Sequence, residues 1–193
     1  MKILVVSQYF YPENFRINDL CYGLNDLGHE VEVLTGKPNY PKGSFYKGYS
    51  WYTKQTEIIN GIKVYRSNLI PRGNSGGFRL FLNYISFVFF ASIKLLFIKQ
   101  KFDKIFVYAP SPITVGFIGI IAAFIFRAKP FLWVHDLWPE SLKDAGGITN
   151  KIVLGLVNLM TKLIYHFYDI ILVQSPRFRE YLIEQGVSEN KIL

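Results

Sequence analysis

Apolar segments of two kinds alternate along the chain. Short continuous runs are typical of strands buried on both faces, and they occupy residues 2–7, 31–35, 104–108, 131–135 and 170–174. Longer runs predict helices between these strands, at residues 15–27, 79–99, 113–126, 151–167 and 177–185. This alternation predicts an α/β fold, with a Rossmann-like, doubly wound, mainly parallel sheet and helices on both faces.

Local signals refine the ends of several elements. Asn60-Gly61 lies between residues 56–59 and 62–66 and predicts a β-hairpin insert. Gly28 is expected to end the first helix, and Asn150 to cap the helix at residues 151–167. Residues 189–193 resemble the start of a further strand. We therefore expect residues 1–193 to be one domain, the first half of a longer protein that is truncated before a carboxyl-terminal domain.

Three helical runs carry further positional information. Gly116, Gly119 and Ala123 share one face, which would allow close packing against a sheet. In the helix at 151–167, an apolar stripe lies opposite His166, which predicts a surface histidine; the stripe comprises Ile152, Leu156, Met160, Leu163 and Phe167. The run at residues 80–98 would be about 28 Å long as a helix. It fits a membrane span, a helix on the membrane surface or an ordinary buried helix.

Positive charge is concentrated between residues 37 and 104, where twelve lysines and arginines face only Glu57 and Asp103. The rest of the chain is slightly acidic, so this segment accounts for the net charge of +8. Charge localised in this way predicts an anionic partner at a defined face. Aromatic residues and the apolar run at 80–98 accompany it, which favours a lipid phosphate or an anionic membrane surface. The residues predicted to associate with the membrane are Lys94, Lys99 and Lys101.

Composition restricts the class of protein. A hydrophobic content of 50% with 17% aromatic residues excludes a disordered chain. The single cysteine, Cys21, cannot form an internal disulfide and has apolar neighbours, which indicates a reducing compartment. Residues 1–8 lack a cleavage site and are not expected to be a signal peptide. We expect a cytoplasmic location.

In a doubly wound sheet, ligands bind beyond the carboxyl ends of the strands, so residues that follow each strand are the candidates for chemistry. The segment HDLWPES follows the strand at 131–135. We predict His135, Asp136 and Glu140 as catalytic, because a histidine beside a carboxylate can orient a sugar hydroxyl or stabilise developing positive charge. In the alternative interpretation, Asp136 and Ser141 only cap turns while Trp138 packs in the core.

Polar residues that follow the other strands are candidates for substrate binding, namely Glu13, Asn14, Arg16, Lys37, Tyr40, Lys42, Arg72, Arg79 and Ser111. Three alternatives stay open. Asn14 could cap the first helix, residues 37–42 could be a solvated loop, and residues 73–77 could be either a flexible closure over an acceptor or a simple linker.

Several functions lose their usual support. Residues 8–14 contain no glycine and the second strand ends in Thr35-Gly36, so the fingerprint of NAD binding is missing. The sequence has no Walker lysine, no Cys or His pair at metal spacing and no Gly-x-Ser-x-Gly elbow. No cofactor and no metal site are predicted.

Four segments together resemble a known family: MKILVVSQYFYPENFRINDL, GLNDLGHEVEVLTGKPNYPKG, PSPITVG and HDLWPESL. They are similar to the amino-terminal domain of bacterial family 4 glycosyltransferases that build O-antigen and capsule repeat units. The resemblance implies the two-domain GT-B architecture, in which this half binds the acceptor and a second half binds the nucleotide-sugar donor. It also implies transfer with retention, N-acetylhexosamines as common donors and sugars on undecaprenyl diphosphate as acceptors.

The resemblance also places residues. His135 and Asp136 would lie beside the transferred sugar, and residues 9–14 would approach the donor phosphates, although this loop lacks the Gly-Gly pair of better-known members. A UDP-sugar donor and a peripheral position on the cytoplasmic face of the bacterial inner membrane are expected. This half alone is expected to be inactive.

Two functions from other classes remain possible on the residues alone. Basic residues among aromatics could bind single-stranded nucleic acid, but no such motif is present and the apolar run at 80–98 would serve no purpose there. We therefore expect no nucleic-acid partner. A membrane-docked scaffold without catalysis is the other alternative.

Overall fold

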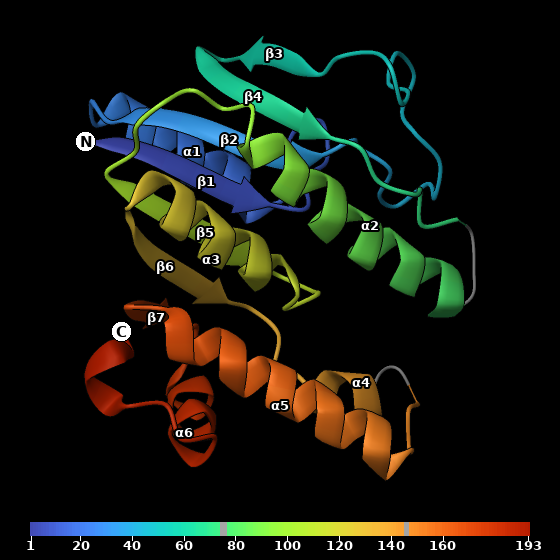
Figure 1. Ribbon diagram of the computed structural model, residues 1–193, viewed down its shortest axis with the longest axis vertical. Coiled ribbons are helices and arrows are strands. Elements are labelled where there is room, and N and C mark those ends of the chain that lie inside the picture. Colours follow the sequence, from blue (N-terminus) through green and yellow to red (C-terminus); the bar gives the residue numbers. More distant parts are fainter. Residues whose placement is uncertain (74–76, 145–146) are drawn as a thin grey trace.

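The computed structural model describes residues 1–73, 77–144 and 147–193. A seven-stranded sheet has the order β3-β4-β2-β1-β5-β6-β7 (Figure 1). Its strands are β1 Lys2–Ser7, β2 Glu30–Gly36, β3 Thr56–Ile59, β4 Ile62–Ser67, β5 Lys104–Ala109, β6 Lys129–Val134 and β7 Ile170–Leu172. Every neighbouring pair is parallel except β3 and β4, which form the antiparallel hairpin. The predicted α/β class with its hairpin insert is confirmed.

Helices cover both faces of the sheet (Figure 1). They are α1 Arg16–Asp26, α2 Gly77–Leu95, α3 Val115–Phe126, α4 Glu140–Asp144, α5 Lys151–Phe167 and α6 Pro176–Glu184, followed by a 3-10 helix, η1, at Glu189–Lys191. Leu4 and Val6 of β1 belong to the core that packs under α2, α3 and α5. Ile3 and Val5 point to the opposite face and pack with α1. The alternation of side chains along a strand thus builds two cores from one run of apolar residues.

The local signals are confirmed. Asn60 and Gly61 have φ of 48° and 80°, the left-handed pair that a two-residue hairpin turn requires. Gly28 has φ 82° directly after α1. The Asn150 side chain accepts hydrogen bonds from the amides of Ile152 and Val153 at 3.0 and 3.2 Å, which caps α5.

Two predicted boundaries are corrected. Helix α2 ends at Leu95 instead of continuing to residue 99, and residues 96–98 complete it with tight turns. The predicted final strand at 189–193 begins instead as η1, and only Ile192 pairs with the sheet, through a parallel bridge to Ile171. The proposed closure at residues 73–77 largely falls on residues 74–76, which lie outside the described residues.

Helix α2 packs with its polar stripe inward. The Asn83 side chain accepts from Gln8 Nε2 at 2.7 Å and donates to the Ile70 carbonyl at 2.6 Å. Ser86 Oγ accepts from the Ile70 amide at 2.9 Å. These hydrogen bonds hold the Asn83 and Ser86 side chains against the sheet. Many large apolar side chains of α2 are therefore on its outward side and exposed. By length and composition alone, α2 could cross a membrane, and 28% of its most apolar stretch is buried.

Most of the apolar stripe predicted for α5 lies at the surface, and of its five residues only Met160 is half-buried against the core. The expectation that this stripe faces inward is therefore wrong. Ile152 is 75% exposed and Leu156 is 64% exposed. The buried side chains of α5 are Thr161, Ile164 and Tyr165. Ile164 is accommodated because Gly116 on α3 has no side chain; a Cβ there would lie 2.6 Å from Ile164 Cγ2. His166 is exposed, as predicted.

Gly119 is expected to tolerate no side chain. A Cβ at Gly119 would overlap Val107 of β5 and the hydroxyl of Tyr168, so Gly119→Ala should lower the free energy of unfolding by about 3 kcal/mol. Gly155 is the matched control, because it lies on α5 with no atom within 4 Å of an added Cβ; Gly155→Ala should raise stability by about 0.5–1 kcal/mol. Urea denaturation measures both, and equal stability of Gly119→Ala and wild type would contradict this packing.

Candidate functional site

A cavity of about 580 Å³ lies beyond the carboxyl ends of β5 and β6. It is formed by α2, the loop after β5, the β6–α4 segment, α4 and the start of α6. Its lining combines carboxylates and hydroxyls with aromatic and aliphatic groups, namely Leu80, Tyr84, Ser111, Asp136, Leu137, Trp138, Glu140, Ser141, Leu142, Asp144 and Phe178. The predicted site residues Ser111, Asp136 and Glu140 are therefore brought together. Planar aromatic rings beside acidic groups are suited to binding a sugar.

Asp136 is held in one orientation by its own loop. Its Oδ2 accepts a hydrogen bond from Trp138 Nε1 at 3.1 Å, and its Oδ1 accepts one from Ser141 Oγ. The carboxylate thus organises the turn, as the alternative interpretation proposed, and it also lines the cavity. Both observations are compatible, because a carboxylate has more acceptor sites than these two donors occupy.

Glu140 is tied to α6. Its Oε2 accepts a hydrogen bond from the Tyr181 hydroxyl. Burial and this carboxylate both raise the pKa of Tyr181, so the phenol stays protonated and remains the donor. The contact joins α4 to α6 across one side of the cavity.

The His135 side chain packs away from the cavity that Asp136 lines. Its ring packs against Tyr108 and Trp133, with centroids 4.7 and 4.2 Å away. Burial lowers the pKa of His135 to about 4, and the Arg16 guanidinium adds to this effect. The imidazole is therefore neutral at pH 7, and its Nε2 finds no hydrogen-bond partner among the described residues. Arg16 and His135 thus lie near one another on the α1 side, as the convergence of the post-strand segments predicts, but His135 does not line the cavity.

Glu13 joins the loops after β1 and β2. It is only 2% exposed, and its Oε1 accepts hydrogen bonds from the amides of Asn39 and Tyr40 at 2.9 and 2.7 Å. Its Oε2 is buried without a partner in the described part of the chain. Burial therefore raises the pKa of Glu13 to about 7, although the backbone amides oppose this shift. Glu13 acts as a positioning residue for the loop that carries Tyr40.

Arg72 connects this loop to the cavity. Its guanidinium stacks on the Tyr40 ring at 4.9 Å and lies 3.5 Å from the Tyr9 hydroxyl. Tyr84, which lines the cavity, is also close, because the Arg72 charge opposes the rise that burial produces in the pKa of Tyr84. A cation in this position could bind a phosphate at the edge of the cavity.

The remaining predicted binding residues lie elsewhere. Lys37 is completely buried and donates to the Thr53 carbonyl. Burial lowers the pKa of Lys37 to about 8, and the nearby positive charge of Lys94 contributes to this lowering. Lys42 lies over the Tyr46 ring at 5.2 Å, and Arg79 donates to the Pro71 carbonyl at 3.2 Å. Asn14 is exposed and does not cap α1, whose cap residue is Phe15 without a side-chain hydrogen bond.

The basic segment does not form a single charged face. Lys63 and Lys104 lie near the amino ends of β4 and β5, at the opposite edge from Arg72. Arg66 is buried and pairs with Glu57 at 2.7 Å. Lys94 is half-buried and donates to Gln55 at 3.3 Å, whereas Lys99 and Lys101 are exposed beyond the end of α2. The sequence could not show this dispersion, because it depends on how the hairpin insert folds back on the sheet.

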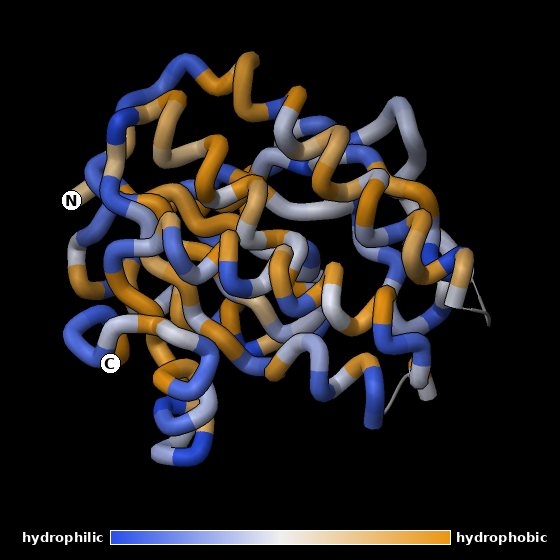
Figure 2. The backbone as a smooth tube through the Cα atoms, turned by 60° about the horizontal axis from the view of Figure 1, so that its bottom comes forward, coloured by the Kyte–Doolittle hydropathy of each residue, from blue (hydrophilic) through white to orange (hydrophobic). Residues whose placement is uncertain are grey.

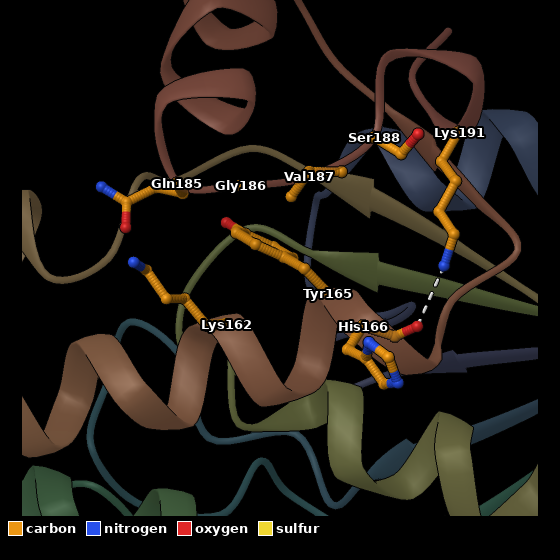
Figure 3. Close-up of a pocket in the computed structure, with 8 residues that line it drawn as sticks. All are labelled: Lys162, Tyr165, His166, Gln185, Gly186, Val187, Ser188 and Lys191. Atoms are coloured by element: carbon orange, nitrogen blue, oxygen red, sulfur yellow. Dashed lines mark hydrogen bonds between the residues drawn. The ribbon is translucent and has the colours of Figure 1, made fainter.

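A second cavity, of about 480 Å³, lies between α5 and the segment after α6 (Figure 3). Lys162, Tyr165 and His166 line it from α5, and Lys191 Nζ donates to the His166 carbonyl at 3.0 Å. No residue predicted from the sequence as a site lines this cavity. Within residues 1–73, 77–144 and 147–193, no three His, Cys, Asp or Glu side chains are placed to hold a metal ion.

Several cavity residues were not predicted as site residues from the sequence, and three of them come from helices far from the HDLWPES segment. Leu80 and Tyr84 come from α2 and Phe178 comes from α6. The post-strand rule cannot identify residues on helices. The spacing of Leu80 and Tyr84 by four positions places them on one face of α2, but nothing in the sequence shows what that face meets.

Comparison with known proteins identifies the family. Residues 14–193 match the family model described as "Glycosyl transferase 4-like domain", so the chain belongs to this family. It is therefore a glycosyltransferase-like domain. A search of curated proteins found no match.

Solved structures share its fold. Sucrose-phosphate synthase from Thermosynechococcus elongatus is 17% identical with a TM-score of 0.66, covering 100% of this chain and 47% of that one. The catalytic domain of starch synthase IV from Arabidopsis thaliana, bound to ADP and acarbose, is 16% identical with a TM-score of 0.60, covering 99% and 50%. The E. coli trehalose-6-phosphate protein bound with UDP-2-fluoro glucose is 11% identical with a TM-score of 0.61, covering 96% and 42%.

The chain thus spans half or less of the length of each of these three structures. At 11–17% identity these likenesses show the fold alone, which is consistent with the predicted half of a GT-B architecture.

Proposed function

We propose that this domain is the acceptor-binding half of a retaining glycosyltransferase that builds O-antigen or capsule repeat units. It transfers a sugar, an N-acetylhexosamine, from a UDP-sugar to a sugar on undecaprenyl diphosphate. A second, carboxyl-terminal domain binds the donor, and the enzyme works at the cytoplasmic face of the bacterial inner membrane. Membership in the family and the resemblance of the four sequence segments support this proposal.

The cavity beyond β5 and β6 is the observation that carries the proposal. Asp136 and Glu140 offer acceptors for sugar hydroxyls, and Trp138, Tyr84 and Phe178 offer apolar surface for a sugar ring. Arg72 lies next to this cavity and can bind the diphosphate of a lipid-linked acceptor. ADP and UDP-2-fluoro glucose in two of the structural neighbours support a nucleotide-sugar donor.

The test uses the complete enzyme with a panel of nucleotide sugars and polyprenyl-diphosphate-linked sugars. Mass spectrometry should show addition of a single sugar to the lipid-linked acceptor, and NMR of the product should show the anomeric configuration of the donor. Absence of transfer across the panel, in a protein that binds these ligands, would contradict the proposal.

Arg72→Ala should weaken binding of the diphosphate-linked acceptor at least about tenfold, because a charge-assisted hydrogen bond to phosphate contributes roughly 1.5–3 kcal/mol. Titration calorimetry with a short-chain acceptor measures this loss. Lys129→Ala is the matched control, since Lys129 is an exposed cation at the start of β6, at the opposite edge of the sheet. Equal affinities for the two variants would exclude Arg72 from the acceptor site.

A further inference from the structure

The helices α2, α3 and α5 form one layer whose outward side is apolar. Contacts join α2 to α3 and α3 to α5, and the three helices lie side by side on one face of the sheet (Figure 1). Large apolar side chains are exposed along the layer and include Phe81, Ile85 and Phe89 on α2, Phe124 on α3, and Ile152, Leu156 and Leu159 on α5. Figure 2 colours each residue by hydropathy and shows hydrophobic (orange) positions at many points along the helical segments. We call this surface the three-helix face. Exposed apolar patches of this extent are unusual unless a partner covers them.

Two apolar hollows lie between these helices. One of about 510 Å³ separates α2 from α3 and is lined by Phe89, Ile93 and Ile121 among others. The other, of about 270 Å³, lies between α3 and α5 beside Phe124 and Phe167. The walls of both hollows are mostly hydrocarbon, with Ser92 in the first and Arg127 in the second as the polar residues, so lipid chains could occupy them with little burial of polar groups.

The charge of the three-helix face fits an anionic lipid surface. Helices α2, α3 and α5 contain no aspartate or glutamate; their charged residues are Arg79, Lys151 and Lys162, together with Lys94, whose side chain turns inward to Gln55. The acidic residues found in helices belong to α1, α4, α6 and η1. Lys162 and Lys191 lie at the border of the face, around the cavity beside α5 (Figure 3). An apolar surface with cations at its edge is typical of proteins that lie on anionic membranes.

The attachment of α2 determines how the domain would lie. The hydrogen bonds of Asn83 and Ser86 to Gln8 and Ile70 hold α2 against the loops of the sheet. Insertion of α2 across a bilayer would break these bonds and place the two polar side chains in hydrocarbon. The geometry therefore favours α2 lying in the plane of the membrane.

We propose that the three-helix face docks on an anionic lipid bilayer, with the outward side chains of α2 and α5 at the boundary between headgroups and acyl chains. The proposal deepens the membrane location of the proposed function and does not depend on sugar transfer. Lys94, which the sequence predicted as a membrane contact, is not part of this docking surface, because its side chain turns inward to Gln55. Leu80 lines the large cavity while Phe81, the next residue, is exposed on α2. A lipid-linked substrate could therefore reach the cavity from the bilayer.

Vesicle flotation of the chain tests this proposal. We expect binding to phosphatidylcholine vesicles that contain phosphatidylglycerol, weaker binding to phosphatidylcholine alone, and loss of the difference at high salt. Phe89→Ser and Leu156→Ser should each lower partitioning about tenfold, and together about a hundredfold, because burial of one such side chain contributes roughly 1.5–3 kcal/mol. Leu27→Ser is the control, since Leu27 is 76% exposed at the end of α1 on the opposite face.

Circular dichroism should show that the variants keep the fold, because the substituted side chains are exposed. Wild-type binding by the double variant would overturn the proposal. So would failure of the wild-type chain to float, accompanied by a dimer in sedimentation that Phe89→Ser or Leu156→Ser dissociates, because the face would then join two copies. Transfer by the complete enzyme, carrying the same substitutions, to an acceptor with a short soluble chain tests the proposed function separately. Loss of flotation with unchanged transfer supports docking, and flotation without any transfer contradicts only the proposed function.

Discussion

Replacement of Asp136 by alanine is expected to lower the rate of sugar transfer by about two to three orders of magnitude, as removal of a group that acts on the transition state does. Asp136 lines the cavity, and two hydrogen bonds from its own loop fix the direction of its carboxylate. A preoriented negative charge can stabilise positive charge that develops on the transferred sugar. The loss should appear in kcat measured with saturating donor and acceptor.

The two roles of Asp136, in the turn and at the substrate, can be separated. Asp136→Asn keeps a side-chain oxygen for the loop but removes the charge, so it should also lower kcat by at least about a hundredfold. Ser141→Ala removes one hydrogen bond to Asp136 and leaves the carboxylate, so it should cost less than about tenfold. Near-normal turnover of Asp136→Asn, or equal losses in Ser141→Ala and Asp136→Ala, would reduce Asp136 to a structural residue.

The second large effect concerns Glu13 and the stability of the fold. Glu13 is 2% exposed, and its carboxyl accepts hydrogen bonds from the amides of Asn39 and Tyr40. Glu13→Ala leaves these two buried amides without an acceptor and creates a cavity, so we expect a loss of about 3–4 kcal/mol. For a chain of 193 residues this corresponds to a fall in Tm of roughly 10 °C. Glu13→Gln keeps an oxygen for both amides and should be far less destabilising.

Glu13 also predicts how stability depends on pH. Burial raises its pKa from 4.5 to about 7 in the folded chain. Between these values the folded state holds a proton that the unfolded state has lost, so the free energy of unfolding falls as pH rises from about 4.5 to 7 and is level above that. The shift corresponds to about 3 kcal/mol. Urea titrations at pH 5 and pH 8 measure the change, and Glu13→Gln should reduce it by that amount. An unchanged pH dependence in Glu13→Gln would show that Glu13 is ionised in the folded protein.

The order of the elements was predictable because it depends on short-range signals. The apolar runs of β1, β5 and β6 are continuous and that of β2 is interrupted by Glu32, a pattern typical of strands covered on both faces. The turn at Asn60-Gly61 and the cap at Asn150 depend only on local backbone geometry. The rule that ligands bind at the carboxyl ends of strands selected Ser111, Asp136 and Glu140, and all three line one cavity.

The site was only partly predictable because the rule locates positions along the chain and leaves the direction of each side chain open. His135 and Asp136 are neighbours, yet the first packs between Tyr108 and Trp133 while the second lines the cavity. Successive residues at the end of a strand point to opposite faces. Lys37 follows β2 as expected, but its ammonium turns inward to Thr53. The roles of His135, Asp136 and Lys37 in catalysis or binding remain predictions.

The sequence by itself determined the strands, the helices, the hairpin and the segment that carries Asp136, because each depends on neighbours within a few residues. Tertiary structure alone decided which sides of α2 and α5 face outward. A helix that is apolar on most of its circumference has no unique inward side, so its orientation depends on what the sheet offers. For α2, the polar groups of Gln8 and Ile70 bind Asn83 and Ser86 and turn the apolar side out. For α5, the notch at Gly116 receives Ile164 and leaves Leu156 at the surface.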